Sequence, residues 1–233
     1  MKPTIDTTIA LIRQLHEGQT DWAGVPYWHH PVAVMNLLPS NSPDDRRFIA
    51  LLHDTLEDCL SVIAKLVGLP ENTPDILQHG ATFLKDQGYS QHVVDGVLLL
   101  TRTKGVAYIN EIRQITASGH LDAMWVKLCD NTHNTDPVRT DKLSPKNRAQ
   151  ALYLKPRYER SMAILQKEIV SRVKSNIIYT NYRGETAVRN IEPLDMRHGS
   201  TEWHPQPQWL LAAMDLDQNV EREFAFNEIQ EIH

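Results

Sequence analysis

The feature that most constrains this chain is a change in sequence pattern near Lys174. Before it, apolar residues recur at helical spacing, and Ser90 and the Ser144-Pro145 pair stand where helices are expected to begin. After it, short β-branched and aromatic runs are separated by two candidate turns, "YRGE" (182–185) and "DQNV" (217–220). We therefore expect a mainly α fold, with an all-helical bundle over residues 1–172 followed by a small C-terminal β module over residues 176–233.

Composition narrows the class of protein. The chain is 41% hydrophobic and 23% charged, as soluble globular proteins are, and no apolar run approaches the roughly 20 residues that span a bilayer. Two cysteines, Cys59 and Cys129, and no signal-like N-terminus favour a reducing compartment. We expect a cytoplasmic protein without a membrane partner. The net charge of -5 also argues against long nucleic acid as a partner.

One short stretch, "ALLHDTLED" (50–58), places ionisable groups directly after an apolar run. Its ionisable residues are His53, Asp54, Glu57 and Asp58. If the stretch is one helix, as we expect, residues four apart lie one turn above each other. Charges at the edge of a core are costly unless they are paired or bind a metal. A polar helix end and the wall of a metal-centred active site are both compatible with this stretch alone.

Two other segments contain possible metal ligands. "GVPYWHHPVAV" contains His29 and His30, and "MWVKLCDNTHN" contains Asp130 after an apolar run. One imidazole, the His53-Asp54 pair and a later aspartate form a mixed nitrogen and oxygen ligand set that suits Mn, Fe or Zn better than Ca or Mg. Because spacing along the chain does not establish convergence in space, both interpretations stay open at this point.

Four blocks together resemble a known family: "HEGQTDWAGVPYWHHP", "ALLHDTLED", "VVDGVLLLTR" and "VKLCDNTHN". Their order and spacing over about residues 5–170 are similar to those of HD-domain phosphohydrolases. The nearest resemblance is to the hydrolase domain of Rel/SpoT-type (p)ppGpp enzymes and their small stand-alone relatives. It implies metal-dependent hydrolysis of a nucleotide, with removal of the 3′-pyrophosphate of a (p)ppGpp-like alarmone.

The resemblance also implies roles for individual residues. Its metal, expected to be Mn²⁺, would be held by His30, His53, Asp54 and Asp130. Glu57 and Asp58 would lie beside the reactive water as catalytic residues, and Asn134 would line the nucleotide pocket. His133 resembles a family residue that orients a metal ligand by hydrogen bonding, but a plain structural role is the one expected for it. His29 is expected to be a neighbour of the site rather than a ligand.

One loop departs from the family pattern. Asp21, Trp22 and Ala23 stand where the (p)ppGpp hydrolases carry a basic pair and a serine. An acid does not replace an arginine as a phosphate contact, although Trp22 can stack on a base or simply pack over the loop. Other basic residues are candidate phosphate contacts: Arg102, Lys104, Arg113, Lys127 and Arg139. The alternatives are a phosphatase of another nucleotide or dinucleotide, and a non-catalytic ligand-binding regulator.

The C-terminal segment resembles a second family. "IIYTNYRGETAVRNIEPLDM" and "WLLAAMDLDQNVEREFAFNEI" are similar to the small β domain called WYL, which implies a twisted small barrel and a ligand or protein partner of unknown identity. Trp203, His204 and Trp209 are candidates for a ligand surface. Trp209 lies within an apolar strand, a position more typical of core packing.

Overall fold

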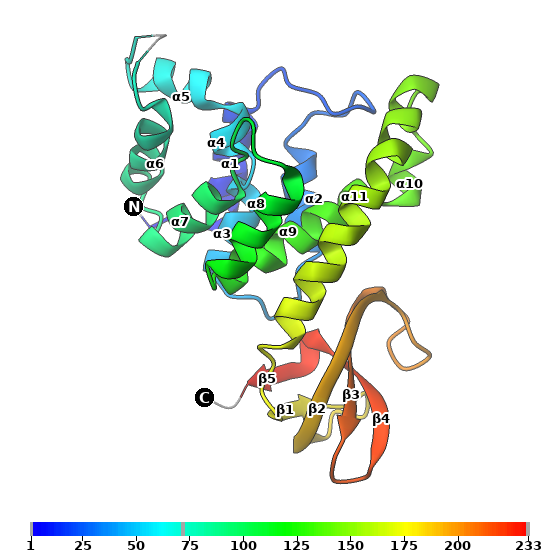
Figure 1. The fold of residues 1–233 in the computed structure, drawn as a ribbon. Helices are drawn as coiled ribbons and strands as arrows, with labels where there is room; N and C mark the ends of the chain where they lie inside the picture. Colours follow the sequence, from blue (N-terminus) through cyan, green and yellow to red (C-terminus); the bar gives the residue numbers. More distant parts are fainter. Residues whose placement is uncertain (1, 71–72, 232–233) are drawn as a thin grey trace.

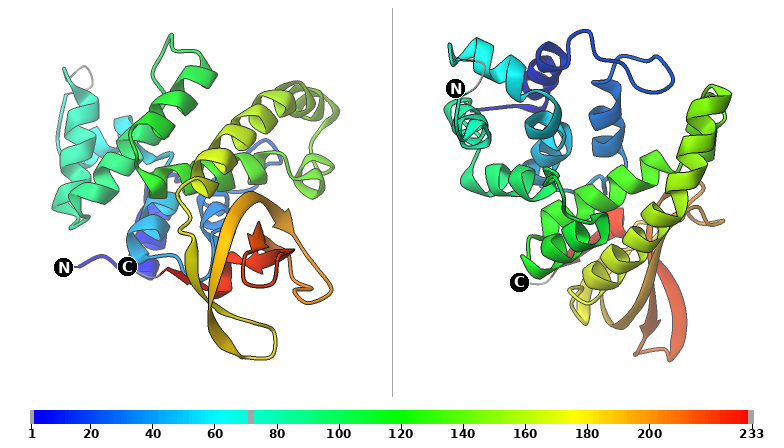
Figure 2. Two further views of the ribbon diagram at one scale, coloured as in Figure 1. Left: turned by 60° about the horizontal axis from the view of Figure 1, so that its bottom comes forward. Right: turned by 45° about the horizontal axis from the view of Figure 1, so that its top comes forward.

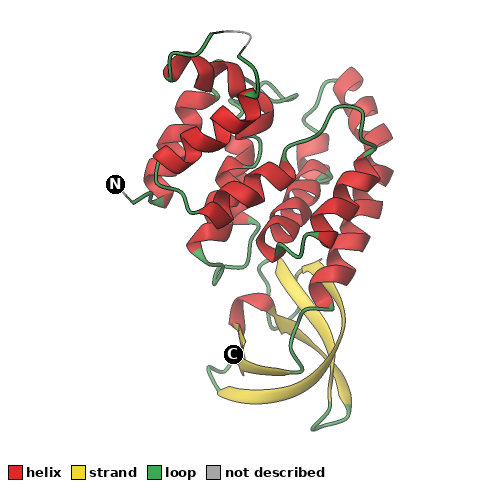
Figure 3. Cartoon of the chain, turned by 60° about the vertical axis from the view of Figure 1, so that its left-hand side comes forward, coloured by secondary structure: helices red, strands yellow, loops and turns green. Residues whose placement is uncertain are grey.

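A computed structural model describes residues 2–70 and 73–231 of the protein. In the order of the chain, helices form one part and strands form a second part beneath it (Figure 1; Figure 3). The helices are α1 (Ile5–Leu15), α2 (His29–Asn36), α3 (Asp44–Leu52), α4 (Thr55–Asp58), α5 (Leu60–Leu66), α6 (Ile76–Asp86), α7 (Gln91–Leu100), α8 (Tyr108–Ala117), α9 (Leu121–Asn134), α10 (Pro137–Thr140) and α11 (Pro145–Val170). None of the described helices has both the length and the apolar character needed to cross a membrane.

Helix α3 forms the centre of the helical part. Its residues from Phe48 to Leu52 are all buried, and α1, α2, α7 and α9 pack around it. Gly96 of α7 allows the close approach of that helix, because a Cβ atom there would lie 2.6 Å from Ile49 Cδ1. Packing on several sides therefore fixes the position of the residue that follows α3, His53.

The helix breaks after Leu52, so the expectation of one continuous helix over residues 50–58 is wrong. His53 and Asp54 form the joint between α3 and α4. His53 Nδ1 lies 2.8 Å from the carbonyl oxygen of Ala50 and so satisfies one of the free carbonyls that every helix leaves at its C-terminus. The break places His53 and Asp54 at the end of a buried helix, not along its side.

Helix α11 connects the helical part to the strands. It begins with the Ser144 cap and Pro145, as expected from the sequence, and it packs along α9 (Figure 2). The contact includes a hydrogen bond from Asn131 Nδ2 to Ser161 Oγ at 2.8 Å. The N-terminal half of α11 extends past α9 toward α10, where it forms one wall of a pocket.

The strands form a single five-stranded sheet with the order β4-β3-β2-β1-β5 and antiparallel neighbours. They are β1 (Asn176–Thr180), β2 (Thr186–Gly199), β3 (Gln208–Asp215), β4 (Val220–Ala225) and β5 (Ile229–Glu231), with the 3₁₀ helix η1 (Phe226–Glu228) before β5. Both hairpin turns predicted from the sequence are confirmed. In the second turn, Asn219 adopts a left-handed φ of 52°, which asparagine tolerates better than most residues.

The prediction of a mainly α class is wrong. Roughly half of the chain is helical, and the fold combines a helical domain with a C-terminal sheet domain. The sheet buries apolar side chains that include Ile177, Ile191, Leu211 and Phe224, and these are part of the same apolar core as the buried residues of the helices. Within the described residues β4 and β5 are the two edges of the sheet and do not pair with each other, so the strands do not close into the expected barrel.

A tryptophan cluster joins the two parts. Trp209 of β3 is 2% exposed, and its indole nitrogen donates to the carbonyl oxygen of Leu37 at 2.9 Å. Trp125 of α9 contacts the rings of Trp209 and Phe226 edge to face, with centroid distances of 5.7 and 5.1 Å. The prediction that Trp209 is a core residue is confirmed, and its role is to seal the sheet against the helices.

Replacing Trp209 by alanine should destabilise the protein by about 3–5 kcal/mol, because the change leaves a cavity and an unpaired Leu37 carbonyl. Equilibrium unfolding in urea, followed by circular dichroism, measures the loss. Trp203→Ala is the matched control: that indole is 55% exposed, and its removal should cost less than about 1 kcal/mol. Equal losses for the two variants would contradict the assigned role of Trp209.

Candidate metal centre and substrate pocket

Four predicted ligands from three segments of the chain converge at the end of α3. The candidate ligand atoms of His30, His53 and Asp54 all lie within 4.8 Å of one another. Asp130 Oδ1 lies 3.2 Å from His30 Nε2 and 3.9 Å from His53 Nε2. His29, one residue earlier, is exposed and stacks on Trp28 with a centroid distance of 3.7 Å, so it lies outside the cluster.

The cluster fits a divalent metal. Two ligand atoms about 2.1 Å from an ion and at right angles to each other lie about 3.0 Å apart. The distances from Asp54 Oδ2 to His53 Nε2 and to His30 Nε2 are 2.9 and 3.5 Å. His53 Nε2 is buried and forms no hydrogen bond of acceptable geometry with the described residues. A buried ring nitrogen without a hydrogen bond, facing two carboxylates, is what a nitrogen ligand requires.

The electrostatics of the cluster match that chemistry. Burial opposes charge on His53, but the carboxylates of Asp54 and Asp130 raise the pKa of His53 to about 9. Burial likewise opposes charge on Asp54, yet His53 and His30 hold the pKa of Asp54 well below its usual range. The protein without metal therefore keeps ionised carboxylates at this point, balanced by a proton on an imidazole.

Hydrogen bonds from three sides orient the carboxylates. The Tyr27 hydroxyl donates to Asp54 Oδ2 at 2.6 Å. Asp130 accepts one hydrogen bond from Lys127 at 3.0 Å and one from the Asn134 amide at 2.6 Å. Partners of this kind hold ligand oxygens in place and are as important to a metal site as the ligands themselves. Tyr27 was not singled out from the sequence, although it precedes His30 by three residues.

His133 lies behind His30, as the resemblance implied. The two Nδ1 atoms are 2.8 Å apart. If His30 offers Nε2 to a metal, its proton must sit on Nδ1, and His133 Nδ1 must accept it. Burial lowers the pKa of His133 to about 3, so His133 is neutral and able to accept. With that arrangement of protons, the pair leaves His30 Nε2 free for a metal.

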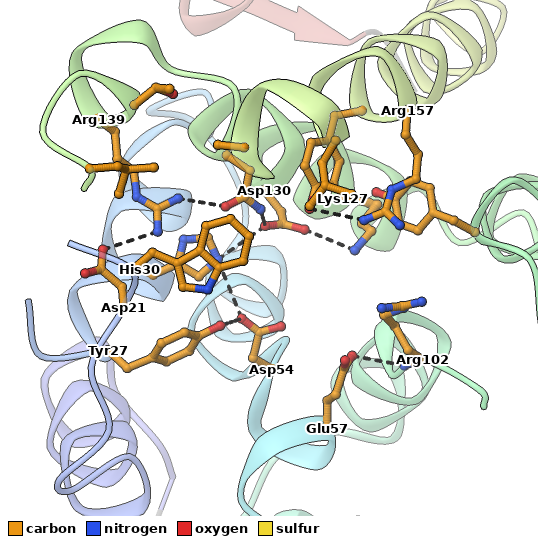
Figure 4. A pocket seen from close by; sticks show the side chains of 18 of the residues that line it. Asp21, Tyr27, His30, Asp54, Glu57, Arg102, Lys127, Asp130, Arg139 and Arg157 are labelled. Carbon is orange, nitrogen blue, oxygen red and sulfur yellow. Dashed lines mark hydrogen bonds and ion pairs between the residues drawn. The ribbon is translucent and has the colours of Figure 1, made fainter. Parts of the chain in front are cut away.

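A pocket of about 360 Å³ opens above the cluster (Figure 4). Its floor includes His30, Asp54 and Asp130, and its far wall comes from the N-terminal half of α11. Four cationic side chains line it: Arg102, Lys127, Arg139 and Arg157. Among the other predicted cations, Lys104 and Arg113 are absent from the lining. A pocket with a candidate metal at its floor and cations around its walls suits a phosphorylated ligand.

Arg157 was not predicted as a pocket residue. Its guanidinium lies over the ring of Tyr108 at 4.5 Å, and its buried Nε atom has no hydrogen-bond partner among the described residues. Lys127, by contrast, is paired with Asp130. No local motif marks Arg157, because its place depends on how α11 packs across α9. In the described part of the chain it faces the pocket without a carboxylate partner.

The two predicted catalytic carboxylates differ in position. Glu57 lines the pocket, and its carboxylate accepts a hydrogen bond from the backbone N–H of Arg102 at 3.2 Å. Asp58 is not among the lining residues. Loss of surrounding water raises the pKa of Glu57, and the same cause together with the charge of Asp54 raises that of Asp58 to about 6. Glu57 is thus the carboxylate positioned to meet a ligand.

The unusual loop at Asp21 has a structural explanation. Asp21 accepts hydrogen bonds from the backbone N–H groups of Ala23 and Val25, and it pairs with Arg139 at 3.2 Å. Loop hydrogen bonds and Arg139 therefore overcome the effect of burial and lower the pKa of Asp21. Because its charge is neutralised by Arg139, Asp21 repels an anionic ligand less than the sequence alone suggests. Trp22, 49% exposed, lies in the pocket lining.

Asn134 lies between this loop and the metal cluster. Its amide nitrogen donates to Asp130, while its carbonyl oxygen accepts from Arg139 at 2.8 Å. A continuous chain of polar contacts thus runs from Asp21 through Arg139 and Asn134 to Asp130, and it ties the loop that carries Trp22 to a candidate metal ligand.

No protein-family model matches the chain. Among curated proteins, a GTP pyrophosphokinase of Myxococcus xanthus is 28% identical over 148 residues, or 59% of this chain and 17% of that protein. The guanosine-3′,5′-bis(diphosphate) 3′-pyrophosphohydrolase of Haemophilus influenzae is 30% identical over 131 residues, or 53% of this chain and 17% of that protein. The bifunctional (p)ppGpp synthase/hydrolase SpoT of Escherichia coli is 32% identical over 123 residues, or 52% of this chain and 16% of that protein.

A solved structure reported under the description "A metazoan ortholog of SpoT hydrolyzes ppGpp and plays a role in starvation responses" aligns with a TM-score of 0.44 at 18% identity. The alignment covers 72% of this chain and 94% of that one. This chain spans about a sixth of the length of the three curated relatives. In sequence, it is homologous to part of the SpoT/Rel (p)ppGpp hydrolase/synthetase proteins.

Proposed function

We propose that this protein is a metal-dependent phosphohydrolase that removes the 3′-pyrophosphate of a (p)ppGpp-like nucleotide. The observation that carries the proposal is the convergence of His30, His53, Asp54 and Asp130 at the floor of a pocket lined by cations. Sequence similarity supports the same substrate class, because two of the curated relatives are named for hydrolysis of (p)ppGpp.

The proposal extends to the two parts of the chain. We assign residues 1–172 to an HD-type phosphohydrolase domain and residues 176–233 to a WYL-like module. The His53-Asp54 pair at a helix joint supports the first assignment, and the paired hairpins support the second.

The proposed cofactor is Mn²⁺, held by His30, His53, Asp54 and Asp130. An ion of this kind supplies Lewis acidity, which makes hydroxide available near neutral pH and polarises a phosphoryl oxygen. The protein supplies orientation: the Ala50 carbonyl holds His53, Tyr27 holds Asp54, and Lys127 holds Asp130.

The remaining pocket residues would bind the nucleotide and transfer protons. Glu57 is proposed to take the proton of the attacking water, since a carboxylate with a raised pKa serves as a general base near neutral pH. Asp58 is proposed to assist from outside the pocket lining. Arg157 has no carboxylate partner in the described chain and would contact a phosphate. Trp22 and Asn134 would face the nucleotide from the opposite wall.

The activity is tested with purified protein, Mn²⁺ and ppGpp by following the release of pyrophosphate. Glu57→Gln should lower kcat by about 100-fold or more, because general acid–base catalysis contributes about 10²–10⁴. Asp58→Asn should lower it by less than tenfold, because Asp58 does not line the pocket. Glu17→Gln, at an exposed site outside the pocket, is the control.

A panel of other nucleotides and dinucleotides belongs to the same experiment. If one of these nucleotides releases phosphate faster than ppGpp releases pyrophosphate, that nucleotide becomes the proposed substrate. The assignment of the active site would not change. Activity unchanged in Glu57→Gln would rule out the assigned proton transfer, and no turnover of any nucleotide by protein with bound Mn²⁺ would favour a ligand-binding regulator.

Binding of Mn²⁺ should depend on pH. Because the pKa of His53 is raised to about 9 without metal, this imidazole must lose a proton to become a ligand at neutral pH. The apparent affinity should therefore fall about tenfold per pH unit as the pH decreases below 9. Isothermal titration calorimetry in buffers of different ionisation enthalpy counts the protons released. Affinity that stays constant between pH 9 and 7 would contradict the assignment of His53 as a ligand.

His133→Ala should weaken Mn²⁺ binding about 10- to 100-fold, the range for residues that orient a metal ligand. The reason is that His30 loses the acceptor that fixes its proton on Nδ1. Calorimetric titration with Mn²⁺ measures the effect without any substrate. His29→Ala is the matched control, since that neighbouring histidine is exposed and should leave the affinity unchanged. Equal affinities of His133→Ala and the wild type would remove His133 from the site.

A further inference from the structure

A second pocket lies in the sheet domain, separate from the candidate metal centre. Its volume is about 570 Å³, within the range of small-molecule sites. Strands β1, β2 and β4 contribute to its walls, together with the loop between β2 and β3 (200–207). The proposed hydrolase activity uses none of the residues that line it.

Two aromatic side chains form a platform at this pocket. Trp203, from the loop between β2 and β3, stacks on Tyr182, from the turn between β1 and β2, with a centroid distance of 4.6 Å and an interplanar angle of 24°. The two side chains are 55% and 51% exposed, so stacking leaves much of each accessible. Paired indole and phenol rings that remain open to solvent favour a further planar ring in the stack.

The loop that carries Trp203 is fixed in place. The Tyr179 hydroxyl and His204 Nε2 lie 3.3 Å apart, and Thr201 and His204 exchange backbone hydrogen bonds of 2.9 and 3.2 Å. The platform is therefore preorganised, which lowers the entropy that a ligand must overcome on binding.

An arginine that pairs with no acid among the described side chains faces the same pocket. Arg189 lies opposite the buried Ile177 in the pairing of β1 and β2, and two residues from the buried Ile191. Since side chains alternate between the faces of a strand, the Arg189 side chain leaves the backbone on the inner face of the sheet. It is half-buried and lines the pocket, yet within the described chain it forms no hydrogen bond or ion pair.

The other charged residues that line this pocket are a second arginine and two glutamates. Arg222 of β4 is already paired, with its Nε atom 3.3 Å from Asp215 Oδ2. Glu223 is occupied by a bidentate contact from Arg197 at 2.7 and 2.9 Å. Glu202, on the exposed loop, has no ion-pair partner among the residues that the structure describes. A half-buried guanidinium without a carboxylate is best satisfied by an anion from solution, and phosphate matches its planar donors.

We propose that this pocket of the sheet domain binds a nucleoside phosphate, with the base stacked on the Trp203–Tyr182 pair and the phosphate at Arg189. The site is independent of the candidate metal centre, so the sheet domain can bind a nucleotide whether or not the helical domain hydrolyses one. The class of ligand follows from the combination of a planar stacking surface and an unpaired guanidinium.

The test uses the full chain without metal, so that no nucleotide is turned over. The chain has five tryptophans, and the indole N–H signals of ¹⁵N-labelled protein report on each of them separately. Addition of GDP or ADP should shift the Trp203 signal. Guanosine, which lacks the phosphate, and inorganic phosphate, which lacks the base, should each act at least about tenfold more weakly.

Affinities from isothermal titration calorimetry complete the test. Trp203→Ala and Arg189→Gln should each weaken binding of the nucleotide that shifts Trp203 by about fivefold or more, in line with the loss of base stacking or of a charge-assisted contact. Glu17→Gln, at an exposed site that lines neither pocket, should leave that affinity unchanged. The proposal is overturned if neither nucleotide moves the Trp203 signal, if phosphate alone binds as tightly as GDP, or if both variants keep wild-type affinity.

Discussion

The structure depends on one histidine buried at the end of a buried helix. His53 follows α3, whose last five residues are packed on several sides, and its Nδ1 is satisfied by the carbonyl of Ala50. That contact lies at the helix break, and it orients the ring so that Nε2 faces two carboxylates. A buried ring nitrogen in this setting needs a proton or a cation to balance the charge around it. The arrangement of α1, α2, α7 and α9 around α3 gives the site its rigidity.

The charged side chains around His53 are each paired with a further polar side chain. Asp54 and Asp130 are held by Tyr27 and Lys127, and a polar chain continues through Asn134 to Arg139 at the pocket mouth. Each carboxylate therefore has a partner before any ligand arrives. Arg157 is different, since it lines the pocket without a carboxylate partner in the described chain, and its Nη2 donates to the Tyr158 hydroxyl at 3.4 Å. The pocket can therefore accept an anion, because the carboxylates at its floor are already paired with other side chains and repel the anion less.

The four residues that converge at the end of α3 lie in motifs that the family resemblance could identify, and both hairpin turns were predicted from local chemistry; that the four residues bind a metal stays a prediction. The helix break at His53 was not predicted, because residues 50–58 contain neither proline nor glycine to mark it. Arg157 was missed for a related reason: its position depends on the packing of α11 over α9, a long-range contact.

The prediction of a mainly α class was wrong because the C-terminal β segment is short and was treated as an addition to a helical protein. About 55 residues form a sheet with five strands, and the 14-residue strand β2 pairs along nearly all of its length with one neighbour or the other. Strand content, unlike helix content, depends on partners that lie far apart in sequence, so single hairpin signals understate the extent of a sheet.

The seam between the two domains also bears on how the chain folds during synthesis. Trp209 donates a hydrogen bond to Leu37, 172 positions earlier, and until Trp209 emerges from the ribosome the face of α9 around Trp125 lacks the part of its cover that comes from the sheet. The helical domain, although it carries every candidate metal ligand, must expose that apolar face while the rest of the chain is being made. Such transient exposure is where nascent chains aggregate or recruit chaperones. Completion of the sheet is thus the step that ends this vulnerability.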